Sequence, residues 1–230
     1  MDAINRHEAM LTRVAQALGP ELLGKVAFVG GCTTGLFLTD AFTKEQVRHT
    51  DDVDLIIDVI GRLEWHQFEA QLRRRGFTDD QEVICRMRLD GLKVDFMPSD
   101  SDILGFSNRW YAQALKTAED YLLSEHMTIR LVTPPCFLAT KLEAYRGRGN
   151  NDPWNSHDIE DLLNLIDGRP SIIEEVSQTD SDLQVYIAKQ LGELLQNPDF
   201  EYVVQSAALG EQDRETLLFE RIEAISQLGQ

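Results

Sequence analysis

Two carboxylates spaced two residues apart open the segment that most constrains the fold of this chain. The segment, residues 52–57, reads DVDLII, and its apolar, β-branched composition predicts a strand buried in a sheet. Side chains alternate between the two faces of a strand, so Asp52 and Asp54 point the same way, with Cα atoms roughly 6.5–7 Å apart. Two carboxylates on one face repel each other unless a cation lies between them. Hard oxygen ligands of this kind suit Mg²⁺, so the sequence predicts a metal site at the start of this strand.

The first ~130 residues alternate apolar runs with helical patterns. Helical spacing of apolar residues predicts a helix over residues 3–18, ended by Gly19-Pro20, and a second over residues 63–75, ended by Gly76. Apolar runs predict strands at residues 26–29, 53–60, 83–89, 92–97 and 127–132. Asp90-Gly91 is a strong turn signal, so the strands on either side of it are expected to form a hairpin.

The pattern changes after Thr133-Pro134-Pro135, which predicts the start of a helix that runs to about residue 145. A polar loop over residues 147–155 and a helix from Ser156 to about residue 166 are expected next, and nearly everything from about residue 171 onward has helical patterning. We therefore predict an α+β fold. Residues 1–132 form a mixed sheet flanked by helices, and residues 133–230 form a helical domain that completes the cleft.

The net charge of −17 is concentrated at the C-terminal end. Residues 151–230 contain 17 acidic and 4 basic residues, whereas residues 1–150 contain 22 acidic and 18 basic residues. Because affinity for nucleic acid depends on cationic contacts to phosphate, this surface disfavours a polyanion over much of its area. An RNA or DNA partner is expected to dock on the N-terminal part.

Hydropathy and cysteine content limit the cellular locations in which this chain is expected. No apolar run approaches the ~20 residues that span a bilayer, and the first residues lack the apolar segment of a signal peptide. The three cysteines are scattered and odd in number, which suits neither a disulfide framework nor a zinc site. We expect a cytoplasmic protein with no membrane partner.

Further residues complete a pattern around the carboxylate pair. Gly30-Gly31 follows a predicted strand and can present bare backbone N–H groups to phosphates, with a hydroxyl from Thr33 or Thr34 as an added donor. Asp95 stands alone in an apolar strand, where an unpaired carboxylate is costly. If the two strands are neighbours, three carboxylates converge and can hold two Mg²⁺ ions ~3.5–4 Å apart. Asp95 is then a general base or a shared metal ligand.

This order of motifs resembles the polymerase-β-like nucleotidyltransferases. More narrowly, the chain is similar to the AbiEii-type nucleotidyltransferases, the toxin half of some toxin–antitoxin and phage-abortive systems. The resemblance covers about residues 28–166 and includes, beyond the glycine pair and Asp95, three motifs: Arg48-x-Thr50-x-Asp52-x-Asp54, Lys141-Leu142-x-Ala144 and Asp158-x-x-Asp161.

The resemblance implies a Mg²⁺- or Mn²⁺-dependent enzyme that transfers a nucleoside monophosphate from an NTP to an acceptor and releases pyrophosphate. The acceptor is expected to be a tRNA 3′ end, a protein or a small molecule, and a cognate antitoxin is a further expected partner. The implied metal ligands are Asp52, Asp54 and Asp95, and Lys141 neutralises phosphate charge. The implied nucleotide-binding residues are Gly30, Gly31, Thr33, Thr34, Arg48, Asp158 and Asp161, the last two orienting either Lys141 or the nucleotide.

Simpler interpretations remain open at this point. The aspartates could face solvent, the glycine pair could form only a tight turn, and Lys141 could be an ordinary surface lysine. Asp158 could serve as negative charge at a helix N-terminus. The alternative at the level of function is a catalytically silent module on the same fold that binds nucleotide or another protein.

Overall fold

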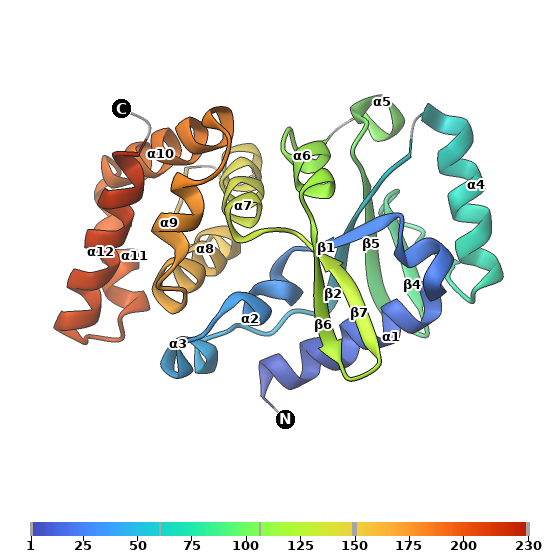
Figure 1. The fold of residues 1–230 in the computed structure, drawn as a ribbon, viewed down its shortest axis with the longest axis horizontal. Coiled ribbons are helices and arrows are strands. Elements are labelled where there is room, and N and C mark those ends of the chain that lie inside the picture. The colour runs from blue at the N-terminus through green and yellow to red at the C-terminus, as the bar shows by residue number, and fades with distance from the viewer. Residues whose placement is uncertain (1, 60, 106, 149–150, 229–230) are drawn as a thin grey trace. The chain divides into compact units, whose positions relative to one another are not determined.

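The computed structural model describes residues 2–59, 61–105, 107–148 and 151–228. A seven-stranded mixed sheet forms the centre of the N-terminal part of the chain. The strand order is β3-β4-β5-β2-β1-β7-β6, and Figure 1 labels all of these strands except β3. The strands are β1 (Val26–Val29), β2 (Asp52–Ile57), β3 (Thr78–Asp79), β4 (Arg86–Leu89), β5 (Leu92–Pro98), β6 (Glu119–Ser124) and β7 (Met127–Leu131). The β2–β5 and β1–β7 pairs are parallel, and the other neighbouring pairs are antiparallel.

Helices pack on this sheet. The bounds are α1 (Ala3–Leu23), η1 (Gly31–Thr33), α4 (Gly61–Arg74), α5 (Ser101–Leu104) and α6 (Tyr111–Lys116). Asp2 caps α1 by accepting a hydrogen bond from the Asn5 N–H at 2.8 Å. Gly19, with φ of 61°, breaks the helical conformation before Pro20, so the predicted helix stop is a kink followed by one further turn. Phe68 of α4 packs on Phe96 of β5, with ring centroids 5.5 Å apart.

The hairpin β4–β5 forms as its turn residues predict. Asp90 and Gly91 both have positive φ, 46° and 87°, which matches the two-residue turn that favours Asp-Gly. Leu89 pairs with Leu92, and the register then places Arg86 opposite Asp95. Strand β4 begins at Arg86 rather than at Val83, because Asp80 accepts hydrogen bonds from the N–H groups of Glu82 and Val83 and forms a turn there.

In a second compact unit, the regular secondary structure of the described residues is all helical. This unit contains residues 34–47 and 134–230, whereas residues 1–33 and 48–133 belong to the sheet unit. Its helices are α2 (Thr34–Phe37), α3 (Ala41–Glu45), α7 (Pro134–Arg148), α8 (His157–Gly168), α9 (Ile172–Ser177), α10 (Ser181–Leu195), α11 (Pro198–Ala207) and α12 (Gln212–Ser226). Ser156 caps α8 through the Ile159 N–H, as predicted.

Residues 34–47 belong to the helical unit for a clear physical reason, although the sequence analysis placed them in the N-terminal domain. Arg214 of α12 forms salt bridges with Asp40, which caps α3, at 2.5 Å and with Asp167 of α8 at 2.7 Å. The Thr39 N–H also donates to the Gly168 carbonyl at 2.9 Å. The contacts made by Thr39 and Asp40 join segments more than 120 residues apart in sequence, so no local pattern reveals them.

The predicted fold class, α+β with a mixed sheet flanked by helices, is confirmed. The sequence analysis missed β3, β6 and the short helices η1, α2, α3, α5 and α6, which carry little periodicity. Ile60, the predicted end of the second strand, and residues 149–150 of the predicted loop lie outside the described residues. None of the helices in the described part of the chain combines the length and the apolar composition needed to cross a bilayer.

Candidate functional site

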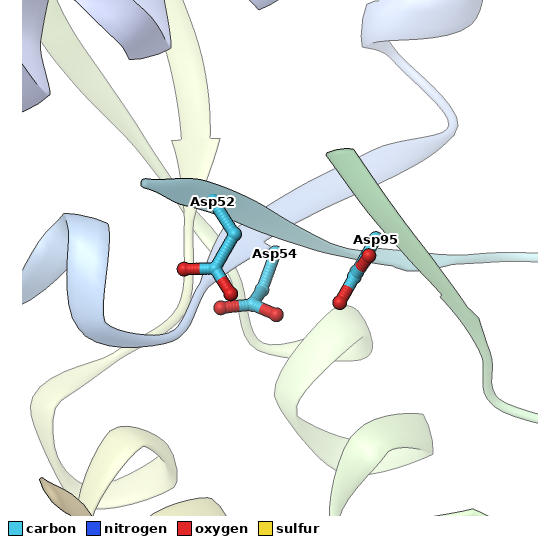
Figure 2. Close-up of side chains that lie close together, drawn as sticks. All are labelled: Asp52, Asp54 and Asp95. Atoms are coloured by element: carbon cyan, nitrogen blue, oxygen red, sulfur yellow. The ribbon is translucent and has the colours of Figure 1, made fainter. Parts of the chain in front are cut away.

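Asp52, Asp54 and Asp95 come together on one face of the sheet, and we call them the carboxylate triad. Asp52 and Asp54 lie on β2, and the parallel register of β2 and β5 pairs Asp54 directly with Asp95. Figure 2 shows the three side chains turned toward one another. One carboxylate oxygen from each lies within 4.8 Å of the others. Asp95 is buried, and Asp52 and Asp54 are half-buried.

The donor set of the triad fits a hard divalent cation. Carboxylate oxygens are preferred by Mg²⁺, which holds its ligands at about 2.0–2.1 Å and keeps several waters. Oxygens that already lie within 4.8 Å of one another need only small side-chain movements to share an ion. Three carboxylates this close also repel one another, so cationic charge is required at this place.

Arg86 of β4 supplies one such charge and was missed by the sequence analysis. Its Nε donates to Asp95 Oδ1 at 2.7 Å and its Nη2 donates to Asp95 Oδ2 at 2.8 Å. The same Nη2 lies 3.9 Å from Oδ2 of Asp52. The hairpin contained the signal, because pairing of Leu89 with Leu92 across Asp90-Gly91 also pairs Arg86 with Asp95.

Asp51 stands apart from the triad, as the alternation of side chains along the strand predicts. Its carboxylate accepts a hydrogen bond from the Lys93 ammonium at 2.7 Å. That hydrogen bond lowers the pKa of Asp51 below its ordinary value. Asp51 therefore has its own cationic partner.

The absence of a side chain at Gly30 leaves the space that the Asp54 carboxylate occupies. The Gly30 φ of 80° lies in the region that favours glycine, and a Cβ at this position would lie 1.9 Å from Oδ2 of Asp54. Gly31 begins the short helix η1, in which the Thr33 hydroxyl donates to the Gly30 carbonyl at 2.8 Å. The glycine turn and the triad are thus in direct contact, with Thr33 stabilising the turn itself.

Arg48 and Thr34, two more residues of the predicted nucleotide site, differ in their hydrogen bonding. Arg48 is half-buried and its Nη1 donates to the His49 carbonyl at 3.4 Å. Thr34 begins α2 of the helical unit, and its Oγ1 is buried with no hydrogen-bond partner among the described residues. A buried hydroxyl without a partner is unusual in a folded protein, so Thr34 retains an open donor.

Thr50, two residues before Asp52, fixes the start of β2 through two hydrogen bonds. The Thr50 hydroxyl donates to Asp52 Oδ1, and the Thr50 N–H donates to Nε2 of the buried His7 at 3.2 Å. Cys32 lies beside this group. Burial, with the charges of Asp54 and Asp52 as further causes, raises the pKa of its thiol well above the usual value.

Lys141, Asp158 and Asp161 form a second cluster, which lies within the helical unit. The Lys141 ammonium on α7 lies 3.2 Å from Asp158 and 2.6 Å from Asp161, both on α8. The three side chains are buried, and Arg148 adds two hydrogen bonds of 3.0 Å to Asp158. The predicted pairing of the lysine with the two aspartates is therefore present as a buried ion cluster that ties α7 to α8.

Comparisons with known proteins add no assignment. No model of a known protein family matches the chain, and a search of curated proteins finds no relative. The interpretation of function therefore depends on the chemistry of the carboxylate triad and its surroundings.

Proposed function

We propose that this protein is a Mg²⁺-dependent nucleotidyltransferase that moves a nucleoside monophosphate from an NTP to an acceptor. The observation that carries the proposal is the carboxylate triad, in which one oxygen of each aspartate lies within 4.8 Å of the others. The glycine turn at Gly30, in contact with Asp54, supports it further, because bare backbone next to a metal site is where a phosphate chain can approach.

The residues have distinct roles in the proposed reaction. The acceptor oxygen forms a bond to the α-phosphorus. The bond between that phosphorus and the oxygen that bridges the α- and β-phosphates breaks, and pyrophosphate leaves with the electron pair. Asp95 is the base proposed to take the acceptor proton, while Asp52 and Asp54 hold Mg²⁺. When bound, the metal supplies positive charge to the leaving phosphates. Gly30, Gly31 and Thr33 position the triphosphate.

The acceptor class follows from the charge distribution. Residues 151–230 contain 17 acidic and 4 basic residues, so a polyanion is repelled over this part of the surface. This favours a protein or small-molecule acceptor over a tRNA 3′ end. An acidic surface also suits a basic partner protein, which is the form we propose for a cognate antitoxin if the protein acts as a toxin in the cytoplasm.

Pyrophosphate release tests the proposal. The protein is incubated with each NTP, Mg²⁺ and either total RNA, total protein or small metabolites, with label on the α-phosphate. We expect pyrophosphate from at least one NTP and label in one acceptor fraction. Asp54→Ala should abolish both, whereas Asp51→Ala, which removes a neighbouring carboxylate paired with Lys93, should retain them. Turnover by the Asp54→Ala protein would refute the assignment of the site.

One observation favours a second candidate function, a silent nucleotide-binding or protein-interaction module. Both oxygens of Asp95, the proposed base, already accept hydrogen bonds from Arg86. This leaves the carboxylate less able to take a proton from an acceptor. Calorimetry separates the two candidates: NTP binding that is independent of Mg²⁺, together with no pyrophosphate from any NTP and acceptor, would favour the silent module.

A further inference from the structure

Arg86 is placed at the triad by the backbone and not only by its own flexible side chain. Strands β4 and β5 pair Arg86 with Asp95, and the Phe96 N–H donates to the Cys85 carbonyl at 2.8 Å beside this pair. The Arg86 and Asp95 side chains are 19% and 12% exposed. A guanidinium fork that meets a carboxylate through two parallel hydrogen bonds is the strongest form of this ion pair. The cation is therefore a fixed part of the site.

The charge of Arg86 is permanent. A guanidinium does not lose its proton in a protein. Three aspartates and one arginine give the group a formal net charge of −2. A single divalent cation neutralises it, whereas two would leave an excess of positive charge.

We infer that Arg86 takes the place of a second divalent cation, so that the nucleotide-free protein binds one Mg²⁺ or Mn²⁺ through Asp52 and Asp54. The inference rests on the proposed function insofar as it takes the triad to be a metal site. It departs from the two-ion expectation because both oxygens of Asp95 already accept hydrogen bonds from the guanidinium.

Repulsion excludes the second ion. Arg86 Nη2 lies 2.8 Å from Asp95 and 3.9 Å from Asp52, so an ion shared by these two carboxylates would lie a few ångströms from the guanidinium. Two cations at that distance in a partly buried site repel strongly. The second ion could enter only after the Arg86–Asp95 pair had opened, and a nucleotide triphosphate is the kind of ligand whose charge could favour that opening.

Counting bound Mn²⁺ tests this inference without any measurement of activity. Electron paramagnetic resonance and calorimetry give the number of Mn²⁺ ions per chain and their affinity, in the absence of nucleotide. We expect one ion for the unmodified protein. Arg86→Gln should bind a second ion or hold the first at least about tenfold more tightly, because a unit charge has left the site. Arg88→Gln is the matched control, since Arg88 lies two residues along β4 and pairs with Asp80 at 2.7 Å; it should bind one ion with unchanged affinity.

A second variant keeps the test decisive if Arg86→Gln fails to fold. Asp95→Asn should still bind one Mn²⁺, because Asp95 is not a ligand while Arg86 holds it. Two ions in the unmodified protein, an Arg86→Gln protein identical to it, or complete loss of Mn²⁺ in Asp95→Asn would each overturn the inference. Absence of Mn²⁺ from every folded variant, the unmodified protein included, would instead refute the metal site of the proposed function.

Discussion

Arg86 and Asp95 face each other across β4 and β5 and are joined by two hydrogen bonds of 2.7 and 2.8 Å. This pair links the hairpin to the carboxylate triad, since Asp95 is also the direct partner of Asp54 in the sheet. The pair thus has a structural role in addition to its proposed effect on metal binding, and the two can be measured separately.

The structural role predicts a positive coupling energy. Asp95→Asn removes the closest carboxylate partner of a partly buried guanidinium and leaves it with Asp52 at 3.9 Å. We expect this variant to lower the free energy of unfolding by about 2–3 kcal/mol, somewhat less than the cost of breaking a fully buried pair. The double variant Arg86→Gln/Asp95→Asn should cost less than the sum of its two single variants. Urea unfolding in the presence of EDTA measures all four proteins free of metal, and strict additivity would contradict a stabilising pair.

Gly30→Ala tests the contact between the glycine turn and Asp54. Alanine at φ of 80° costs roughly 1–2 kcal/mol, and its Cβ would lie 1.9 Å from the Asp54 carboxylate and displace it. We expect Mn²⁺ affinity to fall by roughly tenfold or more, which corresponds to about 1.4 kcal/mol.

Gly76→Ala is the control for Gly30→Ala. Gly76 also has positive φ, 92°, but a Cβ there meets no atom within 4 Å. This variant should lose a similar amount of stability and keep its Mn²⁺ affinity. Equal metal affinity in the two alanine variants would show that Asp54 can move without loss of binding.

Lys141 is predicted to stabilise the helical unit strongly. Lys141→Ala removes the cation between two buried carboxylates, of which Asp158 keeps Arg148 as a partner. Breaking a buried ion pair by removing one partner costs about 3–5 kcal/mol. Lys189→Ala is the control, because Lys189 is 68% exposed and lies 3.8 Å from Glu193; an exposed pair of this kind is worth less than about 1 kcal/mol. Thermal unfolding by circular dichroism compares the two, and a Lys141→Ala protein as stable as Lys189→Ala would contradict the assignment.

The buried thiol of Cys85 is expected to lower the free energy of unfolding at alkaline pH. Burial, with the nearby charge of Asp95, raises the pKa of this thiol from 9.0 to about 11. Because the folded state favours the neutral thiol, its contribution is complete below pH 9 and is lost as the pH rises from 9 to 11, by about 2–3 kcal/mol. The measurement is the free energy of unfolding of the unmodified protein and of Cys85→Ala across this range. The unmodified protein should lose more stability with pH, and parallel curves would rule out the thiol as the cause.

The sequence by itself determined the features that depend on neighbouring residues. The alternation of side chains along residues 51–54 separated Asp51 from the carboxylate pair, and Asp90-Gly91 specified the turn between β4 and β5. Gly19 marked the end of the regular part of α1, and Ser156 marked the start of α8. Each of these depends on backbone conformation or capping within a few residues, which a single sequence displays directly.

The tertiary structure alone decided which distant side chains meet. The pairing of Asp54 with Asp95 follows from the strand order β5-β2-β1, and the buried cluster around Lys141 follows from the packing of α7 against α8. Strand order and helix packing depend on contacts between residues far apart in the chain, whose burial outweighs the cost of closing long loops. The local register of the β4–β5 hairpin places Arg86 opposite Asp95, and the long-range pairing of β5 with β2 brings that pair to Asp52 and Asp54. The motif of three aspartates thereby becomes a site that already contains one cation.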